Sequence, residues 1–172
     1  MIKHKSIEKK LVLLISGGLD STLAYHYALK EKGYNPNDIL CLWFDIGQPY
    51  RKKELKSLQQ TKIPFKTINL NLIRDEFNNI PTTDFPNHII PGRNLIMATI
   101  AASFGERIWL IALDTEMHKF AKERDKSVKF YNDTSKLLTY IFNIKRDKTI
   151  IETPFKNMTK TEIVKWALNN GL

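Results

Sequence analysis

Short apolar runs alternate with longer amphipathic segments along the chain. The apolar runs have the length of buried β-strands, and polar residues or glycines bound them. The amphipathic segments repeat apolar residues at helical spacing, and the first of them stops at Gly33. The expected strands cover residues 10–15, 39–44, 65–70, 108–113 and 149–152. The expected helices cover residues 23–33, 50–62, 94–104, 128–142 and 159–168.

This alternation predicts a doubly wound α/β fold, in which a five-stranded parallel sheet carries helices on both faces. We expect residues 1–172 to form a single domain, because no linker or repeat interrupts the pattern. Residues 71–92 and 119–129 are expected to be irregular, and the apolar helix 94–104 to be buried. Such sheets bind ligands beyond the carboxyl ends of their strands. The loops of interest therefore begin at residues 16, 45 and 114.

Cysteine content and hydropathy indicate in which cellular compartment the protein is expected. Cys41 is the single cysteine, which excludes an internal disulfide and a multi-cysteine zinc site within this chain, so zinc is not expected. Its place in an expected strand predicts a buried, packed side chain. No apolar run is long enough to cross a bilayer, and the basic N-terminus lacks a signal-peptide cleavage site. We therefore expect a cytoplasmic protein without a membrane partner.

The chain is basic, with 27 Lys and Arg against 18 Asp and Glu and a net charge of +9. Such a charge attracts nucleic acid or anionic small molecules. The basic residues are mostly lysines spread along the sequence, without an arginine-rich stripe or an aromatic-basic repeat. We therefore favour a solvated lysine-rich surface and do not expect a nucleic-acid partner.

The stretch "SGGLDST" lies between the first expected strand and the first expected helix. Gly17 and Gly18 allow the backbone to approach a ligand closely. The helix start adds unpaired N–H groups, and Ser16, Ser21 and Thr22 add hydroxyls, so the loop is suited to hold phosphate. The alternative is a tight turn with an Asp-Ser helix cap. The loop is neither a Walker A motif nor a GxGxxG motif.

Three later segments carry candidate ligand-binding residues. In "LWFDIGQPYRKKEL", Gln48 follows a strand and could read the edge of a nucleotide or substrate. Trp43 and Phe44 could flank adenine or pack in the core. Arg51 and Glu54 could bind a ligand or form a surface ion pair.

In "IIPGRNLIMATIAAS", Arg93 follows a glycine at a helix start, where its guanidinium could bind phosphate or carboxylate bidentately. In "ETPFKNMTKTEIVKWALNNG", Lys160 could bind phosphate or be solvated on the last helix.

These motifs resemble those of a known family. The "SGGLDST" loop resembles the SGGxDS loop of the PP-loop ATP pyrophosphatase superfamily, whose Rossmann-like fold is of the adenine nucleotide alpha-hydrolase type. The later segments are similar in order and spacing to the FDYGQxHRxE, PGRN and ETPLxxxxKxEI segments of the 7-cyano-7-deazaguanine synthase family. The resemblance runs from about Leu11 to Leu172.

The resemblance implies a ligase that forms a carbon–nitrogen bond. Enzymes of this family use ATP, Mg²⁺ and ammonia to convert the small molecule 7-carboxy-7-deazaguanine into 7-cyano-7-deazaguanine for queuosine biosynthesis. The reaction passes through adenylated intermediates and releases AMP and pyrophosphate. A homodimer is compatible with the resemblance.

The resemblance also assigns roles to residues of this chain. The implied catalytic residues are Asp20, Arg93 and Lys160. The implied ATP-binding residues are Ile15, Ser16, Gly17, Gly18, Asp20, Ser21, Thr22, Phe44, Gly47, Gln48 and Arg93. The implied substrate-binding residues are Gln48, Arg51, Asn94, Asp114, Glu116 and Asp125, with His118 a further candidate. A charged, solvated loop is the alternative for Glu116 and His118. No residue is assigned as a metal ligand.

The chain departs from the family pattern in two places. The family carries a four-cysteine zinc site beyond the last matched segment, whereas Cys41 is the only cysteine here. After the fourth expected strand Ala112 replaces a glycine, and "ERDKSVKF" matches the family's substrate loop only loosely. The alternatives are therefore a one-step enzyme that stops at 7-amido-7-deazaguanine, another PP-loop adenylating ligase or tRNA thiolase, and a non-catalytic nucleotide-binding module.

Overall fold

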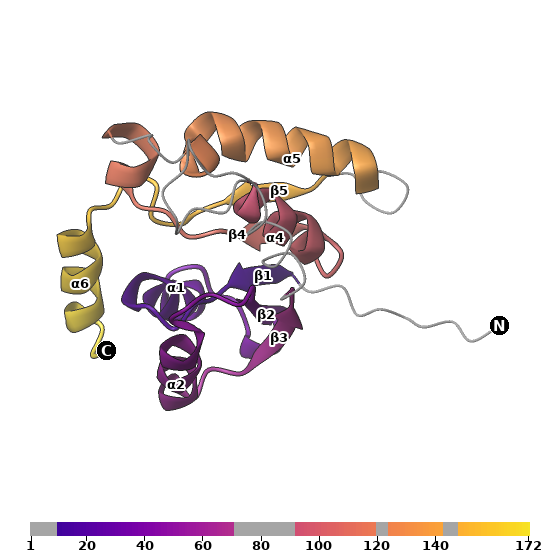
Figure 1. The fold of residues 1–172 in the computed structure, drawn as a ribbon. Coiled ribbons are helices and arrows are strands. Elements are labelled where there is room, and N and C mark those ends of the chain that lie inside the picture. The colour runs from indigo at the N-terminus through magenta and orange to yellow at the C-terminus, as the bar shows by residue number, and fades with distance from the viewer. Residues whose placement is uncertain (1–9, 71–91, 120–123, 143–147) are drawn as a thin grey trace.

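The strands form one parallel sheet with the order β3-β2-β1-β4-β5 (Figure 1). The computed structural model describes residues 10–70, 92–119, 124–142 and 148–172. In this part of the chain the strands are β1 (Leu11–Leu14), β2 (Ile39–Asp45), β3 (Phe65–Asn69), β4 (Arg107–Trp109) and β5 (Ile150–Glu152). Each neighbouring pair is parallel. The prediction of a doubly wound, five-stranded parallel sheet is confirmed.

Helices cover both faces of the sheet (Figure 1). One face is packed by α1 (Leu19–Lys30), α2 (Arg51–Thr61) and α6 (Lys160–Asn169), and the other by α4 (Arg93–Ala102) and α5 (Val128–Phe142). Side chains of β1 alternate between the two cores: Leu11 and Leu13 belong to the first, Val12 and Leu14 to the second. Because both faces of a central parallel strand are buried, β1 reads as a continuous apolar run. No helix in the described segments is long and apolar enough to span a membrane.

The strand order reverses at β1, which lies between β2 and β4. From β1 the chain crosses to β2 through α1 on one face, whereas α4, on the opposite face, leads into β4. The loops that follow β1 and β4 therefore separate at the carboxyl ends of these strands. Doubly wound folds bind their ligands in the crevice that this divergence leaves.

Two expectations about local structure need correction. β4 ends at Trp109, not at Leu113, because its partner β5 ends at Glu152. Beyond that point the Leu110 N–H still donates to the Glu152 carbonyl at 3.1 Å. At the next pairing position the Thr153 side-chain hydroxyl takes the place of backbone hydrogen bonds between the two strands. It accepts from the N–H of Ala112 at 3.3 Å and donates to its carbonyl at 2.9 Å.

The stretch after β4 is also more ordered than expected. It contains a π-helical turn at Thr115–Lys119 and a 3-10 turn at Arg124–Lys126. The apolar helix α4 buries one face through Asn94, Ala98, Ala101 and Ala102, and its other residues are half-buried, so the expectation of a wholly buried helix is met only in part. The irregular segment expected at 71–92 lies almost wholly outside the described residues.

Candidate functional site

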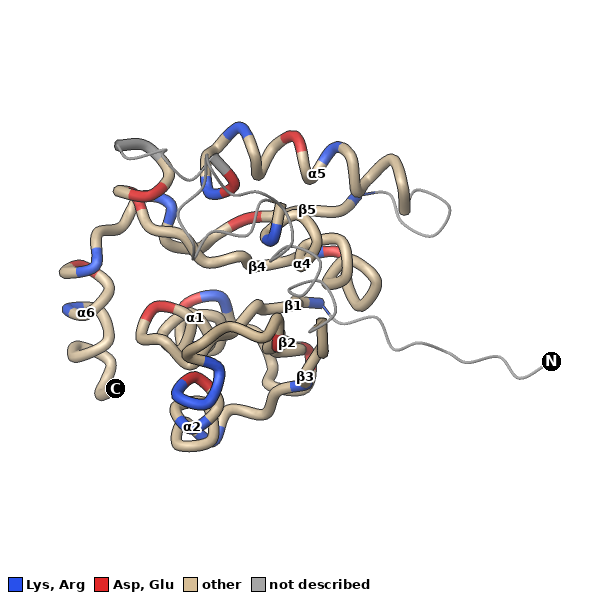
Figure 2. The backbone as a smooth tube through the Cα atoms, in the orientation of Figure 1, with Lys and Arg blue, Asp and Glu red and all other residues tan. Residues whose placement is uncertain are grey.

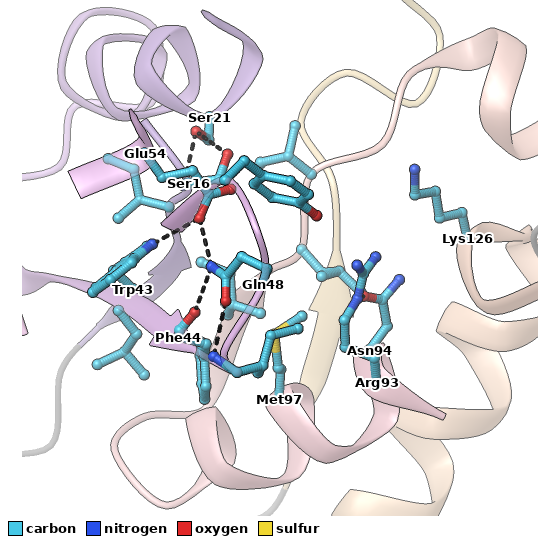
Figure 3. Close-up of a pocket in the computed structure, with 17 residues that line it drawn as sticks. Ser16, Ser21, Trp43, Phe44, Gln48, Glu54, Arg93, Asn94, Met97 and Lys126 are labelled. Atoms are coloured by element: carbon cyan, nitrogen blue, oxygen red, sulfur yellow. Dashed lines mark hydrogen bonds between the residues drawn. The ribbon is translucent and has the colours of Figure 1, made fainter. Parts of the chain in front are cut away.

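A cavity of about 250 Å³ lies at the carboxyl ends of β1, β2 and β4, where the strand order reverses (Figure 3). Its walls combine apolar side chains with hydroxyl, amide and charged groups. They are formed by Leu14, Ile15, Ser16, Ser21, Leu42, Trp43, Phe44, Ile46, Gln48, Tyr50, Glu54, Arg93, Asn94, Met97, Leu110, Ile111 and Lys126. Of the residues predicted for the site, Ile15, Ser16, Ser21, Phe44, Gln48, Arg93 and Asn94 line this cavity.

The loop after β1 is closed by the hydroxyls of Ser16 and Ser21. Ser21 Oγ accepts from the Ser16 N–H at 3.1 Å and donates to the Gly18 carbonyl at 3.1 Å. The Gly18 N–H donates to Ser16 Oγ at 3.3 Å, and the two hydroxyl oxygens are 3.3 Å apart. Ser21 is buried, whereas Ser16 and Gly18 are exposed. The inner serine therefore holds the loop, and the outer groups remain accessible to a ligand.

Helix α1 begins at this loop without a side-chain cap. Its N-cap is Gly18, in an extended conformation, and no side chain in the described residues caps the helix. The alternative of an Asp-Ser cap is therefore wrong. The N–H groups of the first helical turn have no partner within the helix and carry the positive end of the helix dipole. Together with the exposed Ser16 hydroxyl they form a place where an anion can bind.

Gly17 and Gly18 differ in backbone conformation and in how closely other parts of the chain approach them. Gly17 has φ of +73°, and a Cβ built there would lie 2.8 Å from the Glu54 carbonyl oxygen and 3.0 Å from Leu58 Cγ. The Gly17 carbonyl also accepts from Ser57 Oγ at 2.6 Å. Gly17 is therefore needed for the close approach of α2. A Cβ at Gly18 would meet only Ser16 Oγ, at 3.3 Å, so the open side of the loop belongs to Gly18.

Asp20 and Lys160 meet beside the loop. The Lys160 ammonium lies 3.2 Å from Asp20 Oδ1 and 3.3 Å from Oδ2, with hydrogen-bond geometry only toward Oδ2. Asp20 Oδ1 is shielded from solvent and has no hydrogen-bond partner among the described residues. Both residues were predicted to be catalytic, and they come from opposite ends of the chain. The pair lies outside the cavity wall.

The Gln48 side chain is bonded to its own loop and to α2 (Figure 3). Its Nε2 donates to Glu54 Oε2 at 2.6 Å and to the Phe44 carbonyl at 3.2 Å, and its Oε1 accepts from the Ile46 N–H at 3.0 Å. Glu54 Oε2 also accepts from Trp43 Nε1 at 3.0 Å. Both amide hydrogens of Gln48 are thus used inside the chain. A direct role of Gln48 in reading a ligand stays a prediction.

The opposite part of the cavity wall carries two cations, Arg93 and Lys126 (Figure 3). Arg93 Nε donates to Asn94 Oδ1 at 3.4 Å, and Asn94 Nδ2 donates to the Asp125 carbonyl at 3.3 Å. Lys126 Nζ lies 2.7 Å from Glu116 Oε1. Glu116 Oε2 in turn accepts from the Leu113 N–H at 2.9 Å. Glu116 and Asp125 therefore support the wall without being part of it.

The remaining predicted residues whose side chains the structure describes lie away from the cavity wall. Arg51 is exposed, with Nη1 3.9 Å from Asp45 Oδ1, so its ion pair is with Asp45 and not with Glu54. Asp45 Oδ1 also accepts from the Gly47 N–H at 2.9 Å. The Asp114 N–H donates to the Met158 carbonyl at 3.3 Å. Thr22 is half-buried on α1. The side chain of His118 lies outside the described residues.

Lys126 is a charged residue of the cavity wall that the sequence did not single out, and for Glu54 ligand binding was only one of two alternatives. Lys126 is the last residue of a 3-10 turn, in a stretch that matches the family's substrate loop only loosely and gives this lysine no assigned role. Glu54 lies at helical spacing from Arg51, so a ligand contact and a surface ion pair were equally compatible with the sequence. Its contact with Trp43 depends on how α2 packs against β2.

The one cysteine has no access to this site. Cys41 lies on β2 and is 1% exposed in the core on the α1 face of the sheet, and burial raises the pKa of its thiol from 9.0 to about 12. Among the described residues no group of three or more His, Cys, Asp or Glu side chains is arranged to hold a metal ion.

Comparison with known proteins gives consistent matches. Residues 10–172 match the sequence family described as "Queuosine biosynthesis protein QueC". A 7-cyano-7-deazaguanine synthase of Prochlorococcus marinus (strain AS9601) is 32% identical over 98% of this chain and 81% of its own length. The Campylobacter hominis enzyme of the same name is 32% identical over 95% of this chain and 81% of its own length.

Relatives with lower identity match the same stretch. The 7-cyano-7-deazaguanine synthase 2 of Colwellia psychrerythraea is 25% identical over 95% of this chain and 80% of its own length. Among solved structures, the U34-tRNA thiolase NcsA of Methanococcus maripaludis, determined with its [4Fe-4S] cluster, has a TM-score of 0.59 at 14% identity. The match covers 96% of this chain and 58% of the thiolase chain and shows a shared fold.

Proposed function

The chain belongs to the family of the queuosine biosynthesis protein QueC, and from this premise we propose that it converts 7-carboxy-7-deazaguanine and ammonia into 7-cyano-7-deazaguanine. In this proposal it is an ATP-dependent ligase that forms a carbon–nitrogen bond. We further propose that residues 1–172 form one domain and that the enzyme works in the cytoplasm on a small-molecule substrate.

The observation that carries the proposal is the uncapped start of α1 beside a cavity with apolar walls. Phe44 and Met97 offer apolar surface to a planar base, and the N–H groups at the start of α1 suit the pyrophosphate end of a nucleotide. The residues present therefore fit ATP. Asp20, in the first turn of α1, has an oxygen, Oδ1, that is shielded and lacks a hydrogen-bond partner in the described segments, although the Lys160 ammonium lies 3.2 Å away; this carboxylate could take a Mg²⁺ ligand position.

The proposed chemistry uses ATP twice to convert a poor oxygen leaving group into AMP. A carboxylate oxygen of the substrate attacks the α-phosphorus of ATP, and pyrophosphate leaves. Ammonia then attacks the acyl carbon and loses a proton, and AMP departs with one of the original carboxylate oxygens. The amide oxygen attacks a second ATP in the same way. Loss of that AMP and of the amide protons leaves the nitrile, so both carboxylate oxygens end on AMP.

The chain contributes positioning and charge to these steps. In our proposal the first turn of α1 and Lys160 bind the departing pyrophosphate, and Mg²⁺ neutralises part of its charge when bound. Arg93 lies on the cavity wall away from the serine loop, where its guanidinium can contact the reacting carboxylate and the α-phosphate. The apolar wall keeps water from the acyl-adenylate, which water would hydrolyse.

The test follows the carboxylate oxygens. The purified chain is incubated with ATP, Mg²⁺, ammonia and 7-carboxy-7-deazaguanine labelled with ¹⁸O in both carboxylate positions, and AMP is examined by mass spectrometry. The proposal predicts one ¹⁸O in each AMP and an unlabelled nitrile product. Labelled AMP with accumulated amide would instead establish a one-step amidating enzyme. AMP without label, or AMP that forms without the base, would contradict the proposal.

A further inference from the structure

The charged groups of the cavity are divided between two places. The anion site at the start of α1 lies beside Ser16 and Ser21, and Arg93 and Lys126 lie on another part of the wall (Figure 3). Lys126 comes from the 3-10 turn after β4, within the stretch "ERDKSVKF", where the resemblance assigned a substrate role to Asp125 but none to Lys126. The cavity therefore offers a second positive region, separate from the phosphate-binding loop.

Asn94 holds both sides of this second region. It is 2% exposed at the first turn of α4, and its side-chain oxygen accepts from Arg93 Nε at 3.4 Å. Its amide nitrogen donates at 3.3 Å to the carbonyl of Asp125, the residue immediately before Lys126. One buried side chain thus links the arginine to the turn that carries the lysine.

Glu116 holds the Lys126 side chain in place through an ion pair. Its Oε1 lies 2.7 Å from Lys126 Nζ, and its Oε2 is anchored on the Leu113 N–H at 2.9 Å. Glu116 is not part of the cavity wall, whereas Lys126 is. The lysine thus reaches the cavity wall while its ammonium is paired with Glu116, and an ammonium has three donors with which to bind more than one oxygen. Only 20% of the Lys126 side chain is exposed, which limits its motion.

We propose that Lys126, together with Arg93, binds the carboxylate of the substrate before its activation. The inference rests on the proposed function and adds to it a residue that determines specificity. The shared chemistry is an oxyanion, which the nucleotide could also supply as phosphate. The start of α1 already provides a separate site for phosphate, so we assign the second region to the carboxylate. A guanidinium fork beside an ammonium suits the planar group.

The assignment predicts that Lys126 contributes to binding 7-carboxy-7-deazaguanine, the acid, and not to binding the amide intermediate. 7-Amido-7-deazaguanine, the neutral intermediate, has no charge for an ammonium to hold. The variants are Lys126→Met, which removes the charge at similar length, and Lys126→Arg, which keeps it. Lys129→Met is the matched control, because Lys129 is a highly exposed lysine on α5 that pairs with Asp133. Thermal melting of each variant establishes that it is folded.

The expected result for Lys126→Met is a rise of about 10- to 100-fold in KM for 7-carboxy-7-deazaguanine, as the loss of a charged hydrogen bond implies. The KM for ATP and the turnover of the amide should stay within about twofold of the parent. Lys126→Arg should recover part of the affinity for the acid, and Lys129→Met should behave as the parent does.

Other outcomes separate the two claims. A rise in KM for ATP instead of the acid would assign Lys126 to phosphate and overturn the inference, as would equal losses with acid and amide or no change at all. If the parent converts neither base, the proposed function fails, and calorimetry with 7-carboxy-7-deazaguanine alone decides the inference. Binding by the parent that Lys126→Met loses would support it, and no binding by the parent would overturn it.

Discussion

Lys160 and Asp20 are 140 positions apart in the sequence, yet the lysine ammonium lies 3.2 Å from the aspartate Oδ1. Asp20 belongs to the first turn of α1, and Lys160 is the first residue of α6. A capping box of Thr159 and Glu162 fixes the start of α6, with the Thr159 N–H donating to Glu162 Oε2 at 2.7 Å. These hydrogen bonds lower the pKa of Glu162. The pair connects the last helix to the start of α1, beside the loop that follows β1.

The first prediction concerns the charge of Lys160. An exposed ion pair contributes about 0–1 kcal/mol to folding, so Lys160→Met should lower the melting temperature by less than about 4 °C. A charged hydrogen bond to phosphate contributes about 1.5–3 kcal/mol, so kcat/KM for ATP should fall about 10- to 100-fold. Lys165→Met, an exposed change on the same helix, is the control. Unchanged kinetics in Lys160→Met would remove Lys160 from the proposed site.

The second prediction separates the two loop glycines. Gly17→Ala forces a non-glycine residue to φ of +73° and against the α2 backbone, so we expect the free energy of unfolding to fall by about 2–4 kcal/mol. Gly18→Ala fits its backbone conformation and should change that free energy by less than about 0.5 kcal/mol. Its methyl group lies on the open side of the loop, so ATP affinity should still drop. Urea denaturation and ATP titration measure both effects. Equal stability of the two variants would contradict the account.

The third prediction concerns Glu54, which accepts hydrogen bonds from Trp43 at 3.0 Å and Gln48 at 2.6 Å. Glu54→Ala leaves both donors without their acceptor beside the cavity, so the free energy of unfolding should fall by about 1–3 kcal/mol. Glu54→Gln keeps an acceptor oxygen and should cost less. Glu106→Ala, at an exposed position, is the control. If Glu54→Ala and the control unfold at the same urea concentration, the network does not stabilise the fold.

The fourth prediction is a pH dependence from Cys41. Burial raises the pKa of this thiol from 9.0 to about 12, so above pH 9 the unfolded chain releases the proton before the folded chain does. Stability is therefore lost as the pH rises from 9 toward 12, by about 1.4 kcal/mol at pH 10 from this group. Comparing urea denaturation of the parent and Cys41→Ala at pH 8 and pH 10 isolates the contribution. The parent should lose more stability than the variant, and equal losses would refute the assignment.

The fold could be predicted because burial on two faces leaves a clear pattern in the sequence. Leu11 and Val12 are adjacent, yet they pack into opposite cores, which makes a central strand apolar throughout. The end of β4 could not be predicted, because the Thr153 side chain takes over the pairing of Ala112. That contact joins segments 41 positions apart and has no local signal in the sequence.

Part of the candidate site could also be predicted, because it follows from the parallel sheet. Ser16, Ser21 and Arg93 line one cavity because parallel strands end at the same edge of the sheet. The inward bonds of Gln48 depend on where α2 places Glu54, which periodicity does not determine. Lys126 reaches the wall through a turn that contacts Glu116 and Asn94, and the loose match of "ERDKSVKF" to the family's substrate loop does not predict these contacts.

The most direct test of the central claim is the product of a complete reaction. The purified chain is incubated with excess ATP, Mg²⁺, ammonia and 7-carboxy-7-deazaguanine, and the base, AMP and pyrophosphate are quantified by mass spectrometry. The account predicts 7-cyano-7-deazaguanine with two AMP and two pyrophosphate formed for each nitrile. No modified base and no AMP dependent on the base, from a folded protein that binds ATP, would contradict it.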